Sequence, residues 1–177
     1  MNSTGDIKRV EDADAILRRR VAALLEIGQA DVLVGRSCGR CGSSQHGRPW
    51  ARGRGRRDEV AVSISRCGAH LLTAVSEDAA VGVDIEAVAA VGRIGDSSLV
   101  LHPSESLPGR RTDPGALAAI WARKEAILKA LGDGLATPMA AIRVADHDVV
   151  DLPAPPGHVA ALAVLPGPDP GNAPRRR

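Results

Sequence analysis

Two acidic side chains stand close together in residues 81–86, which read Val-Gly-Val-Asp-Ile-Glu. In an extended strand, residues two apart point to the same face, so we expect Asp84 and Glu86 side by side, about 7 Å apart along the strand. Proteins hold Mg²⁺ with a few carboxylates, waters and substrate phosphates. The pair is therefore a candidate half of a metal–phosphate site. A solvated pair at a strand edge is the alternative interpretation.

A second motif adds a carboxylate and an ammonium. Residues 121–129 read Trp-Ala-Arg-Lys-Glu-Ala-Ile-Leu-Lys. Glu125 and Lys129 are i, i+4 neighbours at the flank of an apolar helical stripe, where core meets surface. An ordinary surface ion pair would explain them as well. Lys124 falls inside the apolar stripe, so it must snorkel, pair with an acid or serve a function.

Secondary structure must bring the two motifs together. Asp113, Pro114 and Gly132 suit the N-cap, the first position and the stop of a helix spanning about 114–131. A helix at about 12–27, ended by Gly28, comes earlier in the chain. The patterns also predict strands at 32–34, 60–65, 71–75, 81–85, 141–144, 149–152 and 158–165. Residues 35–58 are interpreted as loop, and 99–101 fit a helix or a strand. Strands near a helix in both parts of the chain favour α+β layering.

Composition limits the core and the cellular setting. The 177 residues include no Phe or Tyr and two Trp, so the core must be built from Ala, Val, Leu and Ile, and we expect modest stability. We expect one domain over 12–165, with disordered ends at 1–11 and 166–177. We find no secretory h-region and no apolar run of about 18 residues, so we expect no membrane partner. Three cysteines then favour the cytoplasm.

The charge is near neutral but unevenly distributed. A net charge of +2 is too small to indicate nucleic-acid binding by itself. An arginine cluster stands out, formed by Arg48, Arg52, Arg54, Arg56 and Arg57. It would attract a phosphorylated ligand or an acidic protein surface. The alternative is a solvated Gly/Arg loop.

The order and spacing of the two motifs resemble the Sfp-type 4′-phosphopantetheinyl transferases. The family pattern Gly-(Val/Ile)-Asp-x-Glu matches 82–86, and (Trp/Phe)-x-x-Lys-Glu-(Ala/Ser)-x-x-Lys matches 121–129, followed by Gly-x-Gly at 132–134. Upstream, Cys-x-x-Cys-Gly…His-Gly-(Lys/Arg)-Pro matches 38–49. The resemblance covers roughly 12–165. It implies the α+β fold of that family, with two similar halves at about 12–87 and 88–165. Each half has a small sheet packed on a helix, in a monomer with its site between the halves.

The resemblance also implies a reaction. It is the Mg²⁺-dependent transfer of the 4′-phosphopantetheine arm of coenzyme A, the co-substrate, to a serine of an acyl or peptidyl carrier protein. Adenosine 3′,5′-bisphosphate is released, and polyketide or nonribosomal peptide synthesis is the typical setting. The implied site residues are Asp84, Glu86 and Glu125 for the metal; Arg48, Pro49, Ser65, Arg66 and Lys129 for coenzyme A; and Glu125, Lys129 and Glu105 for catalysis. Glu125, directly or through water, or Glu105 would accept the serine proton.

Other interpretations stay open. Arg66 and Cys67 stand where the family has His and Ser, which motivates a non-catalytic domain of this fold that binds coenzyme A or a carrier protein. Cys38, Cys41 and His46 invite a structural zinc site, a redox pair or a zinc-stabilised nucleic-acid module. A fourth zinc ligand is not evident at metal spacing, although His70 or another chain could supply one. The low charge and missing stacking aromatics lead us to expect no nucleic-acid partner.

Overall fold

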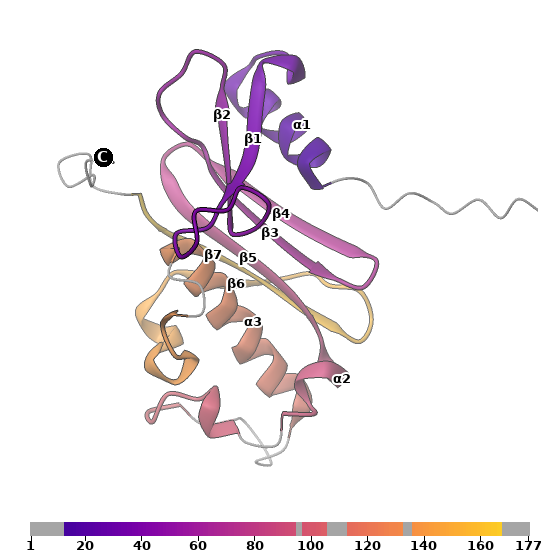
Figure 1. The fold of residues 1–177 in the computed structure, drawn as a ribbon. Coiled ribbons are helices and arrows are strands. Elements are labelled where there is room, and N and C mark those ends of the chain that lie inside the picture. The colour runs from indigo at the N-terminus through magenta and orange to yellow at the C-terminus, as the bar shows by residue number, and fades with distance from the viewer. Residues whose placement is uncertain (1–12, 95–96, 106–112, 133–135, 168–177) are drawn as a thin grey trace, which may run out of the picture.

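The computed structural model describes residues 13–94, 97–105, 113–132 and 136–167, as a mixed α/β protein with small antiparallel sheets and few helices (Figure 1). The α-helices are α1 (Ala13–Leu25), α2 (Val88–Val91) and α3 (Pro114–Leu131), and the 3-10 helices are η1 (Gln29–Asp31), η2 (Ser97–Leu99), η4 (Met139–Ala141) and η5 (Val144–Asp146). The strands are β1 (Val32–Ser37), β2 (Arg48–Gly53), β3 (Ala61–Cys67), β4 (His70–Ser76), β5 (Ala79–Ala87), β6 (Val149–Leu152) and β7 (His158–Pro166). Among these helices, none combines the length and apolarity that crossing a bilayer requires.

Helix α1 packs on the N-terminal strands. Its Leu17 and Val21 are buried against Val32 of β1, Ala51 of β2 and Val62 of β3. β1 pairs with β2 and β3 with β4, each antiparallel, so two hairpins present small aliphatic side chains to the helix. The cluster contains no aromatic side chain, as the composition predicts.

Helix α3 packs on a three-stranded sheet, whose strand order is β5-β7-β6 (Figure 1). Ala126 and Ile127 of the helix are buried against Ala161 and Ala163 of β7. β5 lies within residues 12–87, which the sequence interpretation assigned to the first half, yet it is hydrogen-bonded to β7. β5 therefore joins the two parts of the chain.

Two serine hydroxyls of β3 form the hydrogen bonds that connect β3 to β5. The Val83 N–H donates to Ser63 Oγ at 3.0 Å, and the Ile85 N–H donates to Ser65 Oγ at 3.2 Å. Both serines are buried. The hydroxyls satisfy strand N–H groups that would otherwise be buried without a partner, so β5 is held against β3 without a backbone ladder.

Gly82 allows β5 to lie directly on α3. A Cβ built at this position would overlap the carbonyl oxygen of Ala126 and come within 2.6 Å of the Ala130 nitrogen. Both atoms belong to the helix backbone, which cannot move aside by changing rotamer as a side chain can. The glycine of the 82–86 motif is thus explained by packing, and it sets the distance between the two motifs.

We expect Gly82→Ala to destabilise the protein by about 1–3 kcal/mol or more, because overpacking here displaces backbone. Urea unfolding measures the change. Gly28→Ala is the control, because its new Cβ would approach only the Asp31 carboxylate, at 3.4 Å, and Gly28 already has φ −69°. Equal stability of Gly82→Ala and the wild type would show that the strand and helix are not in this contact.

Most predicted elements are confirmed. α3 has the predicted bounds, with Asp113 Oδ1 accepting from the N–H groups of Gly115 and Ala116, and Gly132 at φ 82°. The strands predicted at 60–65, 71–75, 81–85, 149–152 and 158–165 correspond to β3, β4, β5, β6 and β7. β7 continues to Pro166, the first residue of the predicted tail. Residues 1–11, Gly134 and the tail from 168 lie outside the described residues.

Three local predictions are wrong. Residues 35–58 are not all loop, because β1 continues to Ser37 and pairs with β2, whose Trp50 ring lies over Gly35. α1 ends at Leu25 rather than at Gly28, with Glu26 in the left-handed region at φ 55°. Residues 141–144 form no strand: Ala141 ends η4, Val144 begins η5, and Ile142 and Arg143 link them in extended backbone. The remaining ambiguity at 99–101 resolves with Leu99 in the 3-10 helix η2.

Candidate active site

Asp84 is the centre of the acidic site. It is 2% exposed, and its Oδ1 accepts hydrogen bonds from Ser65 Oγ at 2.7 Å and from Lys129 Nζ at 2.5 Å. Among the described residues, its Oδ2 is the one buried side-chain oxygen or nitrogen without a hydrogen-bond partner. A buried carboxylate oxygen left unpaired is costly, so this atom is suited to a ligand that supplies positive charge.

Lys129 reaches from α3 to β5. Its ammonium donates to Asp84 Oδ1 and also to the Val83 carbonyl oxygen at 3.1 Å. The helical spacing predicts Lys129 beside Glu125 on one helix face, whereas the shortest contact of its ammonium is to Asp84 on the strand. The two motifs therefore meet through this ion pair, with Lys129 partly exposed.

Glu86 and Glu125 complete the acidic group. Burial raises the pKa of Glu86, and the charge of Asp84 raises it further, while Lys129 and a hydrogen bond from Trp121 act in the opposite direction. Burial and then the Asp84 charge likewise raise the pKa of Glu125, against the effect of Lys129. Three carboxylates thus share one ammonium, and their mutual repulsion favours a bound cation.

The acidic group is better suited to a hydrated Mg²⁺ ion than to a metal ion held by protein ligands alone. Its three carboxylates are not gathered within 4.8 Å of one another, the spacing that the structure shows for Cys38, Cys41 and His46. Mg²⁺ usually keeps several waters and takes one or two carboxylates plus substrate phosphates. The unpaired Asp84 Oδ2, together with two glutamates whose pKa the Asp84 charge helps to raise, agrees with that donor set.

Glu105 lies in a different environment from the acidic group. Its Oε2 is paired at 2.6 Å with Lys124, which is completely buried, and it accepts from the N–H groups of His102 and Val144. Burial acts to raise the pKa of Glu105, but these hydrogen bonds outweigh it and the pKa is lowered. Lys124 therefore pairs with an acid, one of the options that the sequence left open.

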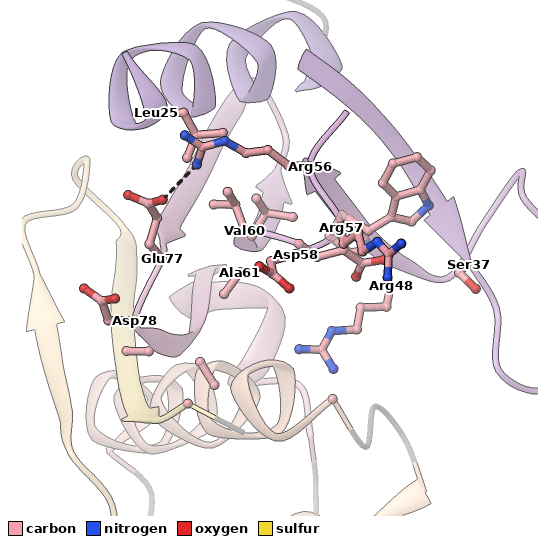
Figure 2. A pocket seen from close by; sticks show the side chains of 18 of the residues that line it. Leu25, Ser37, Arg48, Arg56, Arg57, Asp58, Val60, Ala61, Glu77 and Asp78 are labelled. Carbon is pink, nitrogen blue, oxygen red and sulfur yellow. Dashed lines mark hydrogen bonds and ion pairs between the residues drawn. The ribbon is translucent and has the colours of Figure 1, made fainter. Parts of the chain in front are cut away.

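A cavity of about 1190 Å³ opens beside the C-terminal end of α3. We call it the arginine-lined cavity; Arg48, Arg56 and Arg57 contribute its positive charge. Figure 2 shows Arg48 extending into it and Arg56 paired with Glu77 on its rim, an ion pair of 3.5 Å. Asp58, Glu59, Glu77 and Asp78 also line it, so the cavity carries both signs of charge.

The other residues predicted to bind coenzyme A lie in three different environments. Pro49 lines the arginine-lined cavity together with Arg48, whose guanidinium sits where a Cβ on Gly132 would be. Ser65 is instead engaged between Asp84 and the Ile85 N–H. Arg66 is exposed, and the alternation of side chains along β3 directs it away from the Ser65 face.

Sequence reasoning missed three contributors. Ser63 holds β5 in place, Trp121 hydrogen-bonds Glu86, and Gly132 makes room for Arg48 over the helix end. The alternation of Ser63 and Ser65 on one face of a predicted strand was a usable signal for the first. Trp121 was noted as a match to a pattern and Gly132 as a helix stop, and neither contact could be predicted because the partners are distant in sequence.

Cys38, Cys41 and His46 lie together in the loop between β1 and β2. Cys41 Sγ is 3.3 Å from His46 Nε2. The N–H groups of Cys41 and Arg40 donate to the Cys38 sulfur and lower its pKa. All three cysteines of the chain are free thiols.

Comparison with protein families places part of the chain in a known superfamily model. Residues 80–152 match the family model of the 4′-phosphopantetheinyl transferase superfamily. The match is less than half of the chain, but it runs from β5 through α3 to β6 and so contains both acidic motifs. The mixed α/β architecture is compatible with the fold of that superfamily, and the match supports phosphopantetheine transfer in general. No curated protein matches the chain.

Proposed function

We propose that this chain is an Sfp-type enzyme that transfers the 4′-phosphopantetheine arm of coenzyme A to a serine of an acyl or peptidyl carrier protein, with Mg²⁺. The supporting observation is the buried Asp84, whose Oδ2 lacks a partner beside Glu86, Glu125 and Lys129. The superfamily match covers all four residues. Phosphoryl transfer depends mainly on positioning and charge neutralisation, which this group of side chains can provide.

Each residue has a role in this proposal. Asp84, Glu86 and Glu125 hold the metal, and Ser65 fixes the Asp84 carboxylate by donating to Oδ1. Bound Mg²⁺ would neutralise charge on the pyrophosphate of coenzyme A. Lys129, which is partly exposed, would turn part of its hydrogen bonding toward a phosphate oxygen. The chain thus orients the ligand with groups already fixed by the fold.

Glu125 is the proposed base. The carrier serine oxygen attacks the phosphorus that bears the pantetheine arm, the bond to the bridging pyrophosphate oxygen breaks, and adenosine 3′,5′-bisphosphate leaves. The serine proton passes to Glu125 directly or through water. Glu105 is less suited, because Lys124 and two N–H groups occupy it.

The arginine-lined cavity is the proposed site for the nucleotide end of coenzyme A. Glu125, Lys129 and Gly132 follow one another along the last two turns of α3, a rise of about 10 Å. A ligand lying along these turns would bring its nucleotide toward Arg48 and Pro49 and its pyrophosphate toward Lys129. We further propose that the chain acts as a cytoplasmic monomer whose two halves, each a small sheet on a helix, flank this ligand.

Intact-mass measurement tests the proposal. The protein is incubated with coenzyme A, Mg²⁺ and a panel of apo acyl and peptidyl carrier proteins, some from polyketide and some from nonribosomal peptide systems. We expect one carrier or more to gain the mass of one phosphopantetheine arm, and chelation of Mg²⁺ to prevent the gain. Folded protein that modifies no carrier would contradict the proposed transfer.

A non-catalytic binding domain is the second candidate. It is favoured by Ser65, whose hydroxyl is already engaged, and by Arg66, which faces away from it. Such a domain would bind coenzyme A or a carrier protein and leave both unchanged. Calorimetric binding of coenzyme A without any carrier modification would support this candidate, and carrier modification would eliminate it.

A further inference from the structure

The loop that joins β1 to β2 contains a second group of metal-ligand types, separate from the acidic site. Cys38, Cys41 and His46 each offer one ligand atom, and these atoms lie within 4.8 Å of one another. Two ligands on a tetrahedral zinc ion are about 3.6 Å apart, given bonds of about 2.3 Å to sulfur and 2.0–2.1 Å to nitrogen. The 3.3 Å between Cys41 Sγ and His46 Nε2 is close to that spacing.

The backbone around Cys38 is also arranged for a thiolate. The Cys41 and Arg40 N–H groups point at its sulfur. The turn is fixed by two further bonds, from the Gly42 N–H to the Cys38 carbonyl oxygen at 2.8 Å and from the Cys38 N–H to the Ser43 carbonyl oxygen at 3.0 Å. Gly42 has φ 71°, which favours glycine. Hydrogen bonds of this kind orient and stabilise a metal-bound sulfur.

We propose that Cys38, Cys41 and His46 bind one Zn²⁺ ion, with water in the fourth position. Two sulfurs and an imidazole nitrogen select zinc over Mg²⁺, which prefers oxygen. The fourth position is assigned to water because no further His, Cys, Asp or Glu joins the group among the described residues. The site shares no residue with the acidic group, so it stands whether or not the proposed transfer is correct.

The metal would close the β1–β2 hairpin. The last strand pair is Ser37 with Arg48, so Cys38 follows the pair directly and His46 comes two residues before it. Gly47, at φ 103°, lies so close to the Ser37 carbonyl that a Cβ would overlap it. A zinc ion across the loop would hold both strand ends together and would thereby fix Arg48 at the arginine-lined cavity.

Metal titration of the full chain tests the site. Reduced, chelator-stripped protein is titrated with Co²⁺ alone and then with Zn²⁺. We expect one equivalent of Co²⁺ to produce thiolate-to-metal charge-transfer absorption, which the oxygen ligands of the acidic site do not give, and Zn²⁺ to abolish it. Cys38→Ser and Cys41→Ser should weaken Zn²⁺ binding on the order of 100-fold or more, and His46→Gln by at least about 10-fold.

Matched controls and a second readout make the outcome decisive. Cys67→Ser and His70→Gln remove the same groups elsewhere and should bind Zn²⁺ as the wild type does. In the wild type, Zn²⁺ should protect Cys38 and Cys41 from alkylation and leave Cys67 reactive. The proposal is overturned if no thiolate band appears, if the Cys67 control weakens binding as much as Cys38→Ser, or if the band requires two chains to associate.

Discussion

Asp84→Asn should abolish phosphopantetheine transfer while the protein remains folded. The change removes the charge on Oδ2, a buried carboxylate oxygen that has no partner, and keeps an oxygen for Ser65 and Lys129. A catalytic metal stabilises the transition state by several kcal/mol, so we expect a loss of rate on the order of 10³-fold or more. The initial rate of carrier modification, followed by intact mass, measures this loss.

The fold should survive because the substitution has compensating effects. The asparagine amide leaves a buried donor without a partner, which costs about 1–3 kcal/mol. Removing the negative charge also relieves Glu86 and Glu125, whose pKa values Asp84 raises after burial. Circular dichroism and urea unfolding should therefore show a native protein of slightly altered stability.

A matched control separates the metal role from a general effect of losing an aspartate. Asp151→Asn makes the same chemical change at an exposed residue, which pairs with Arg123 at 2.5 Å. It should transfer at the wild-type rate. Mg²⁺ should raise the unfolding midpoint of the wild type and of Asp151→Asn, and not of Asp84→Asn. Normal transfer by Asp84→Asn would remove Asp84 from the site.

The sequence predicted that the strand motif and the helix motif form one site. It did not predict the ion pair between Lys129 and Asp84 that joins them. Periodicity placed Asp84 and Glu86 on one strand face and Glu125 with Lys129 on one helix face, because each rule acts within a single element. The ion pair between Lys129 and Asp84 depends on how closely β5 approaches α3. That approach is set by Gly82 against the helix backbone, a tertiary contact that periodicity does not contain.

The β1–β2 hairpin was not predicted, because it too depends on tertiary contacts. Its second strand, Arg48–Gly53, contains Arg, Pro and Gly, which carry no strand signal alone. Pairing with β1 and burial of Ala51 under α1 make it a strand. Residues 141–144 show the reverse case: a largely apolar segment suggested a strand, and without a partner strand it only links two 3-10 helices, with Ile142 buried in the core.

Glu105→Gln should destabilise the protein strongly, because Glu105 is the counter-charge of a buried lysine. Lys124 Nζ is fully buried and bonds the Val100 carbonyl at 2.7 Å, the Met139 carbonyl at 3.2 Å and Glu105. The glutamine keeps the shape and leaves an ammonium without a counter-charge, a change that costs about 3–5 kcal/mol. Urea unfolding at neutral pH measures the loss.

The partner substitutions show whether the charge pair is the cause. Lys124→Met combined with Glu105→Gln removes both charges, so it should be less destabilised than Glu105→Gln alone. Equal or greater destabilisation of the double variant would contradict the pairing. The lowered pKa of Glu105 adds a pH signature. Its contribution is complete above the unfolded pKa of about 4.3 and is lost as the pH falls through the folded pKa, so wild type and Glu105→Gln should converge in acid.

The same variant decides what Glu105 does in the reaction. Lys124 and two N–H groups already occupy its oxygens, so we assign it to joining the segments around Val100 and Val144 to α3. Transfer is measured at a temperature where Glu105→Gln is still folded by circular dichroism. We expect a rate close to that of the wild type, because Glu125 is the proposed proton acceptor. A large loss of rate in fully folded Glu105→Gln would instead make Glu105 the base, and its pairing with Lys124 would then have to open during the reaction.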